Sequence, residues 1–174
     1  FTIMLRDVVL CKEMGCDGVV VGILKEDGTV DIDKTSRLVD AAYPMGVTFH
    51  RAFDRVYDHR KGLEEVIRTG CERILTSGLQ PTVSDGAETL KALVDQADGR
   101  IIIMPGSGLR STNLAEIAQK TGATEFHSSA RKQIASAMSY QSPRMGEQLM
   151  QVILDEEEVR QMKLILQQLP QQTS

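Results

Sequence analysis

The chain has 174 residues, of which 41% are apolar and 25% are charged, and this composition is typical of a globular domain with one sizeable core. Its formal net charge of -4 argues against a nucleic-acid partner, because such a partner calls for a basic surface. No apolar run reaches the roughly 20 residues that a membrane-spanning helix needs. We therefore expect neither a nucleic acid nor a membrane among the partners.

The predicted elements alternate between helix and strand along the chain. Residues 1–16 have apolar side chains near helical spacing, which predicts a helix already in progress at the first residue. We expect strand–helix repeats over residues 17–131, an irregular connection over residues 132–154 and a last helix over residues 155–169. The repeats begin with the run CDGVVVGIL, whose β-branched residues between glycines predict a buried strand.

Polar residues and glycines mark the ends of the predicted helices. Asp33 can cap the helix that follows the first strand, and Gly70 follows the last periodic residue of the next helix. Asp155 is the expected N-cap of the last helix, whose acidic first turn (DEEE) we expect to be solvated.

The three cysteines, an odd number, do not indicate a disulfide framework and fit reduced thiols in a cytosolic protein. Cys11 and Cys16 stand five residues apart in the predicted first helix, a spacing that turns their side chains roughly 140° away from each other. We therefore expect them to make a poor chelate. Cys71 is expected to be a small buried hydrophobe.

Alternating strands and helices predict an α/β fold with parallel strands. Three forms fit the pattern: a doubly wound open sheet, a complete barrel with missed elements, or part of an eight-strand barrel. A complete (β/α)8 TIM barrel takes roughly 250 residues, whereas this chain has 174. We therefore predict a single domain over residues 1–174, a partial TIM barrel with strands four to eight and their helices, which lacks the first three strands.

Four consecutive predicted strands end in polar residues, and parallel α/β folds bind ligands at the carboxyl ends of their strands. Either these groups line one pocket, or they form solvated and salt-bridged strand ends. The pocket candidates are His50, Arg51, Asp54, Thr76, Ser77 and His127.

Strand alternation places Thr48 and His50 on one face of their strand, and Glu125 and His127 on one face of theirs. In a barrel this face points inward, so the two histidines could meet there and act as general acid or base. The alternative is that each is a hydrogen-bonded core histidine.

The stretch MPGSGL predicts a strand, a Gly-x-Gly turn and a helix start, which together suit an anion. The later stretch HSSAR ends the last predicted strand, and TIM barrels frequently hold phosphate with the loops after their last two strands. The alternative is a tight turn without a ligand. The anion-binding candidates are Gly106, Ser107, Gly108, Ser128 and Ser129.

Four of these stretches together resemble the copper homeostasis protein family CutC. The stretches are VTFHRAFD, RILTSG, IIIMPGSG and TEFHSSAR, and DGVVVGILKEDGTVD and FTIMLRDV fit the same pattern. The resemblance runs from residue 1 to about residue 131. It implies a TIM barrel, a cytoplasmic location, a homo-oligomer and a link to copper, with Cu(I) as the bound ion.

Three functions follow from this resemblance and from the residues. The first is a Cu(I)-binding copper homeostasis protein, for which the resemblance implies no firmly assigned enzyme activity. The second is a TIM-barrel enzyme that acts on a small phosphorylated or carboxylated substrate, with Arg51 as an anion clamp and Asp54 orienting a histidine. The third is a partial chain without independent function, because an open piece of a barrel leaves two sheet edges uncovered.

Overall fold

The computed structural model describes residues 1–140, 142–146 and 149–169. Its main body is a four-stranded parallel sheet with strand order β1-β2-β3-β4. The strands are β1 (Gly18–Val21), β2 (Gly46–Phe49), β3 (Arg73–Thr76) and β4 (Ile102–Pro105). The predicted α/β class with parallel strands is thereby confirmed.

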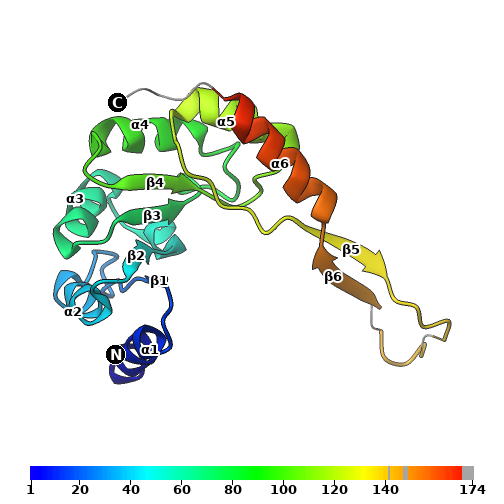
Figure 1. Cartoon of the computed structure of the whole chain (residues 1–174), viewed down its shortest axis with the longest axis horizontal. Coiled ribbons are helices and arrows are strands. Elements are labelled where there is room, and N and C mark those ends of the chain that lie inside the picture. Colours follow the sequence, from blue (N-terminus) through cyan, green and yellow to red (C-terminus); the bar gives the residue numbers. More distant parts are fainter. Residues whose placement is uncertain (141, 147–148, 170–174) are drawn as a thin grey trace.

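Helices connect the strands and lie on one side of the curved sheet (Figure 1). They are α1 (Thr2–Glu13), α2 (Ile32–Ala42), the 3-10 helix η1 (Arg51–Arg55), α3 (His59–Thr69), α4 (Ala87–Ala97), α5 (Ser111–Thr121) and α6 (Glu156–Gln168). Helix α1 packs against α2, and α6 packs against α5. No helix in the described ranges is long and apolar enough to cross a membrane.

The two faces of the sheet differ in burial because only one of them is covered by helices. Val47 and Phe49 of β2 and Ile74 and Thr76 of β3 are buried on the helix-covered face. The alternate residues of the same strands, such as Thr48, are only half-buried on the open face. The core therefore lies between the sheet and its helices.

Local signals at the helix ends explain where the helices begin and end. Asp31, rather than the expected Asp33, caps α2, because its carboxylate accepts a hydrogen bond from the Lys34 N–H at 3.1 Å. Gly70 ends α3 in the left-handed conformation, as predicted. Asp155 is the N-cap residue of α6, also as predicted.

The last predicted strand is reduced to one parallel bridge between Gly106 and His127. Ile102 and Gly106 donate their N–H groups toward β3, so the alternate residues Ile103 and Pro105 direct their backbone groups toward the following segment. There Pro105 accepts from the His127 N–H at 2.9 Å but has no N–H of its own to donate. The ladder therefore cannot extend toward Glu125, and the last strand, which the sequence predicts to end in HSSAR, is shorter than expected.

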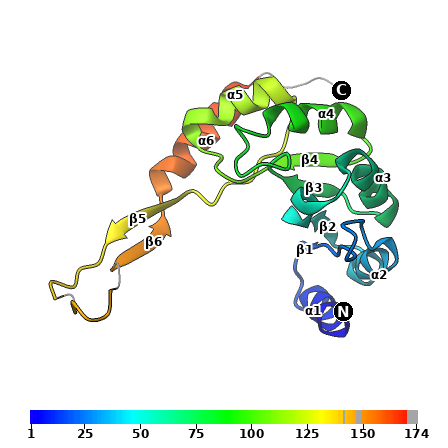
Figure 2. The ribbon, with the colours of Figure 1, turned by 180° about the vertical axis from the view of Figure 1, so that it is seen from behind.

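The expected irregular connection over residues 132–154 instead contains an antiparallel hairpin. Its strands are β5 (Arg131–Ala135) and β6 (Met150–Leu154), and Arg131 pairs with Leu154. The hairpin projects away from the main body (Figure 1), as the reverse view also shows (Figure 2). All ten of its strand residues are exposed, so no alternation of buried and exposed positions marks it in the sequence.

Candidate functional site

The carboxyl ends of β2 and β3 bring four of the predicted site residues into one hydrogen-bonded cluster, which we call the strand-end cluster: Arg51, Asp54, Thr76 and Ser77. Asp54 lies at its centre, with its side chain only 8% exposed. Its Oδ1 accepts from the Thr76 hydroxyl at 2.5 Å and from the N–H groups of Ser77 and Leu79 at 3.0 and 3.2 Å. Its Oδ2 accepts from Arg51 Nε at 2.7 Å.

The electrostatic state of Asp54 follows from these partners. Burial alone would raise the pKa of this carboxyl. The hydrogen bonds from Thr76, Arg51 and the N–H groups of Ser77 and Leu79 outweigh burial and hold the pKa of Asp54 below its usual value. Asp54 is therefore a fully engaged carboxylate at neutral pH.

Arg51 and Ser77 close the cluster. Arg51 Nη2 donates to the Ser77 hydroxyl at 2.8 Å, and that hydroxyl lies 3.0 Å from Asp54 Oδ2 and 2.5 Å from the Gln80 carbonyl oxygen. The Arg51 side chain is still 41% exposed. The arrangement is thus a salt-bridged strand end whose guanidinium also remains open to solvent.

Each of the two predicted site histidines packs closely against a glycine of a neighbouring strand segment. A Cβ added to Gly22 would stand 2.9 Å from His50 Nδ1, and a Cβ added to Gly106 would stand 3.3 Å from His127 Cβ. His50 Nδ1 accepts from the Ala52 N–H at 3.2 Å, while His127 is exposed. In the described part of the chain, no hydrogen bond joins either imidazole to the strand-end cluster.

Two of the three serine candidates for anion binding, Ser107 and Ser128, donate their hydroxyls within the protein. Ser107 donates to the Pro81 carbonyl oxygen at 2.9 Å, and Ser128 donates to the Leu109 carbonyl oxygen at 2.8 Å. Ser107 and Gly108 both have positive φ, of 85° and 73°. Ser129 is exposed. These contacts fix the loops after β4 and after the His127 bridge against their neighbours.

The N-terminus of α5, where the sequence predicts room for an anion, is occupied by a carboxylate of the protein. Glu158 of α6 accepts from the Ser111 N–H at 2.7 Å and from the Ser111 hydroxyl at 2.8 Å. The expectation that the acidic start of α6 is simply solvated is therefore wrong for Glu158, which is half-buried. The carboxylate stabilises the positive end of the α5 dipole.

An ion pair lies at the amino end of β3. Arg73 Nε donates to Glu125 Oε2 at 2.6 Å, and Arg73 Nη1 donates to Glu72 at 2.8 Å. The Glu125 and Glu72 carboxylates raise the pKa of Arg73, with the hydrogen bond from Arg73 to Glu125 as the largest cause. Glu125 thus pairs with an arginine.

Two cysteines lie near the opposite end of the sheet from the strand-end cluster: Cys11 in the last turn of α1 and Cys16 in the turn between α1 and β1. Helix α1 ends at Glu13, so Cys16 lies outside the helix and the expected divergence of Cys11 and Cys16 is wrong. Partial burial, the neighbouring Cys16 thiol and the Asp7 carboxylate raise the pKa of Cys11. Cys71 is buried, as expected, and its burial raises its own pKa. All three cysteines are free thiols.

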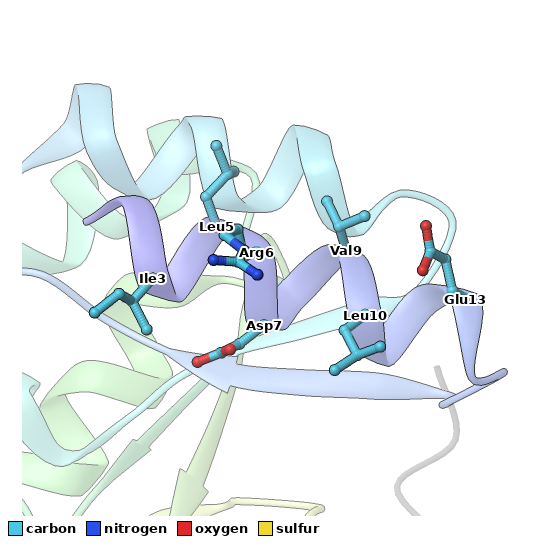
Figure 3. A pocket seen from close by; sticks show the side chains of 7 residues that line it. All are labelled: Ile3, Leu5, Arg6, Asp7, Val9, Leu10 and Glu13. Carbon is cyan, nitrogen blue, oxygen red and sulfur yellow. The ribbon is translucent and has the colours of Figure 1, made fainter.

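A hollow lies along the outer side of α1, away from the strand-end cluster (Figure 3). Only side chains of this one helix line it, so it is an uncovered helix face rather than an enclosed cavity. The lining residues are Ile3, Leu5, Arg6, Asp7, Val9, Leu10 and Glu13. Within the described ranges, no group of three or more His, Cys, Asp or Glu side chains could hold a metal ion.

Comparisons with known proteins place these features in a family. The model of the CutC family matches residues 1–132. A CutC family protein of Chromobacterium violaceum is 47% identical over 146 residues, and one of Parabacteroides distasonis is 50% identical over 139 residues. These matches cover 84% and 80% of this chain but only 59% and 57% of the relatives, so the chain spans less than two thirds of their length.

Solved structures agree with this assignment. A crystal structure described as a copper homeostasis protein CutC from Streptococcus agalactiae superposes with a TM-score of 0.69 at 32% identity, over 72% of this chain and 62% of that chain. A structure described as native KDPGal superposes with a TM-score of 0.55 at 16% identity, over 94% of this chain and 66% of that chain, and so shares the fold alone. The matched residues 1–132 contain the whole parallel sheet and the strand-end cluster, and the chain belongs to the CutC family.

Proposed function

We propose that the chain is part of a (β/α)8 barrel protein that serves copper homeostasis by binding Cu(I). The observation that carries the proposal is membership of the CutC family, together with the likeness to a structure described as a copper homeostasis protein. A cytoplasmic location and a homo-oligomer belong to the same proposal.

The barrel part of the proposal is supported by the placement of the helices. A doubly wound sheet has helices on both faces, whereas a barrel has them only outside. Here they lie on one side of a curved sheet whose strands follow one another in chain order (Figure 1). The open face would then be the barrel interior, and further strands would close it.

Exposed apolar side chains support the same conclusion. Val20 of β1 is 61% exposed, and Ile3 and Leu10 on the uncovered side of α1 are 74% and 52% exposed. The relatives are longer than this chain, and their additional strand–helix units could cover these surfaces. Without such units, a partner or a second copy would have to cover the β1 edge.

The chemistry of Cu(I) directs attention to sulfur, because this soft ion prefers thiolate and thioether ligands. The strand-end cluster offers oxygen and nitrogen atoms that already bind one another. The test is an anaerobic titration of the purified chain with Cu(I), beside a titration with inorganic phosphate. Stoichiometric Cu(I) binding is expected, and its absence would overturn the copper function for this chain.

A second candidate function is an enzyme that acts on a small phosphorylated or carboxylated substrate. The observation in its favour is the half-exposed Arg51 guanidinium at the carboxyl end of the sheet, where His50 also lies. Phosphate binding that is lost in Arg51→Ala or His127→Asn without a loss of stability would support it. Phosphate affinity unchanged in both variants would exclude these residues from an anion site.

A third candidate, a partial chain without independent function, predicts that the chain does not fold alone. Cooperative urea unfolding of a soluble monomer would overturn it.

A further inference from the structure

The turn after α1 has the hydrogen bonds of a Schellman motif. Gly15 has a φ of 79°, its N–H donates to the Lys12 carbonyl oxygen at 3.1 Å, and the Cys16 N–H donates to the Cys11 carbonyl oxygen at 3.0 Å. In this motif the residue after the glycine folds back over the last turn of the helix and contacts the residue five positions earlier. Here both of these residues are cysteines.

The thiols therefore meet because the helix ends between them. Cys16 therefore folds back beside the last turn of α1, which carries Cys11. Cys11 is half-buried and Cys16 is exposed, so a ligand can reach the pair from solvent. Both thiols are free. Because α1 ends at Glu13, the angle that separates Cys11 from Cys16 on a continuous helix does not apply to these two side chains.

We propose that Cys11 and Cys16 together bind one Cu(I) ion as thiolates. This inference rests on the proposed copper function and names its site. Two thiols each lose a proton to solvent and donate an electron pair to the ion, and no atom changes its oxidation state. Soft thiolates select Cu(I), which accepts as few as two ligands.

The surroundings of the pair favour Cu(I) over ions that need larger ligand sets. A structural zinc site takes four ligands, and within the described residues no group of three or more His, Cys, Asp or Glu side chains could hold a metal ion. Met14 follows Cys11 by three residues, the spacing at which helical side chains are neighbours, and it is 74% exposed. Its thioether is therefore available as a third soft ligand.

The dithiol site is separate from the strand-end cluster. Cys16 lies two residues before β1 begins at Gly18, which places the pair at the amino end of the sheet. Arg51, Asp54 and Ser77 lie at the carboxyl ends of the neighbouring strands. A substitution at one site can therefore be tested without disturbing the other.

The experiment is an anaerobic competition titration of the 174-residue chain with Cu(I) against a chromophoric Cu(I) chelator. The wild-type chain is expected to bind one Cu(I). Cys16→Ser should lose this binding, and its circular dichroism spectrum should stay unchanged because Cys16 is exposed. Cys71→Ala is the control for a thiol outside the site and should retain the binding.

A matched pair of glycine variants tests the geometry with both thiols kept. Gly15 and Gly99 have φ values of 79° and 71°, and a Cβ added to either meets nothing within 4 Å. Alanine is strained in this conformation. Gly15→Ala should weaken Cu(I) binding several-fold, because the left-handed turn that brings Cys16 back toward Cys11 is strained for alanine, whereas Gly99→Ala should leave it unchanged.

The outcomes separate the site from the function. If wild type and Cys16→Ser bind Cu(I) equally well, the dithiol site is wrong and the copper function stands. If Cys71→Ala loses the binding while Cys16→Ser retains it, the site is also wrong. If the wild-type chain does not bind Cu(I), the site and the copper function of this chain both fail.

Discussion

The strand-end cluster and the cysteine turn lie at opposite ends of the same sheet and differ in how far their side chains are already engaged. At the carboxyl end, Asp54 accepts hydrogen bonds from Thr76, Arg51 and the N–H groups of Ser77 and Leu79. At the amino end, the helix-ending turn brings Cys16 back toward Cys11, and both thiols are free. The polar residues of the strand-end cluster thus stabilise the fold, whereas the thiols of Cys11 and Cys16 remain available to bind an external ion.

The largest expected effect comes from removing the centre of the strand-end cluster. Asp54→Ala should lower the free energy of unfolding by about 3 kcal/mol, because buried donors of Thr76, Ser77 and Leu79 lose their acceptor. Cys16→Ser at the exposed turn should change it by less than about 0.5 kcal/mol. Urea unfolding of both variants measures the contrast, and equal stability of the two would contradict the assigned structural role of Asp54.

A smaller effect is expected at the contact between α5 and α6. Glu158→Gln keeps the shape of the side chain but removes the charge at the α5 N-terminus, and should cost about 1 kcal/mol. Glu157→Gln is the control, because Glu157 is exposed and pairs with Arg160 and Gln161 of its own helix. Thermal unfolding checks the difference. Equal melting temperatures of the two variants would mean that Glu158 does not stabilise the α5 end.

The smallest effect is the pH dependence that Asp54 adds. Its pKa is lower in the folded chain than in the unfolded chain, so its contribution to stability is present above the unfolded pKa of about 3.9. This contribution is lost as the pH falls through the lower, folded value. Wild type should therefore lose more stability than Asp54→Asn between neutral pH and pH values below about 4. Parallel unfolding curves of the two proteins across this range would contradict the assigned pKa direction.

Much of the fold could be predicted from the sequence because its signals are local. A β-branched run between glycines marked β1, and Gly70 marked the end of α3. The hairpin of β5 and β6 was not predicted, because its strand residues are all exposed and show no alternation of apolar and polar positions. The shortened pairing of His127 depends on which way Pro105 faces, and that is known only once the register is known.

The candidate site was predicted only in part. The rule that parallel strands share one carboxyl edge correctly brought Arg51, Asp54 and Ser77 together. It could not show that the Asp54 carboxylate accepts its hydrogen bonds from groups within the protein. It also could not show that Glu158 accepts a hydrogen bond from Ser111, which lies 47 residues earlier in the chain. The cysteine pair was missed although Gly15 is a local helix-end signal, because the first helix was extended through it.

X-ray absorption of the chain loaded with one equivalent of Cu(I) tests the central claim most directly, because it identifies the atoms bound to the ion. We expect a first coordination shell of sulfur from Cys11 and Cys16, with no imidazole nitrogen. A shell of nitrogen and oxygen would contradict it, because those ligands would come from residues such as His50 and His127 at the opposite end of the sheet.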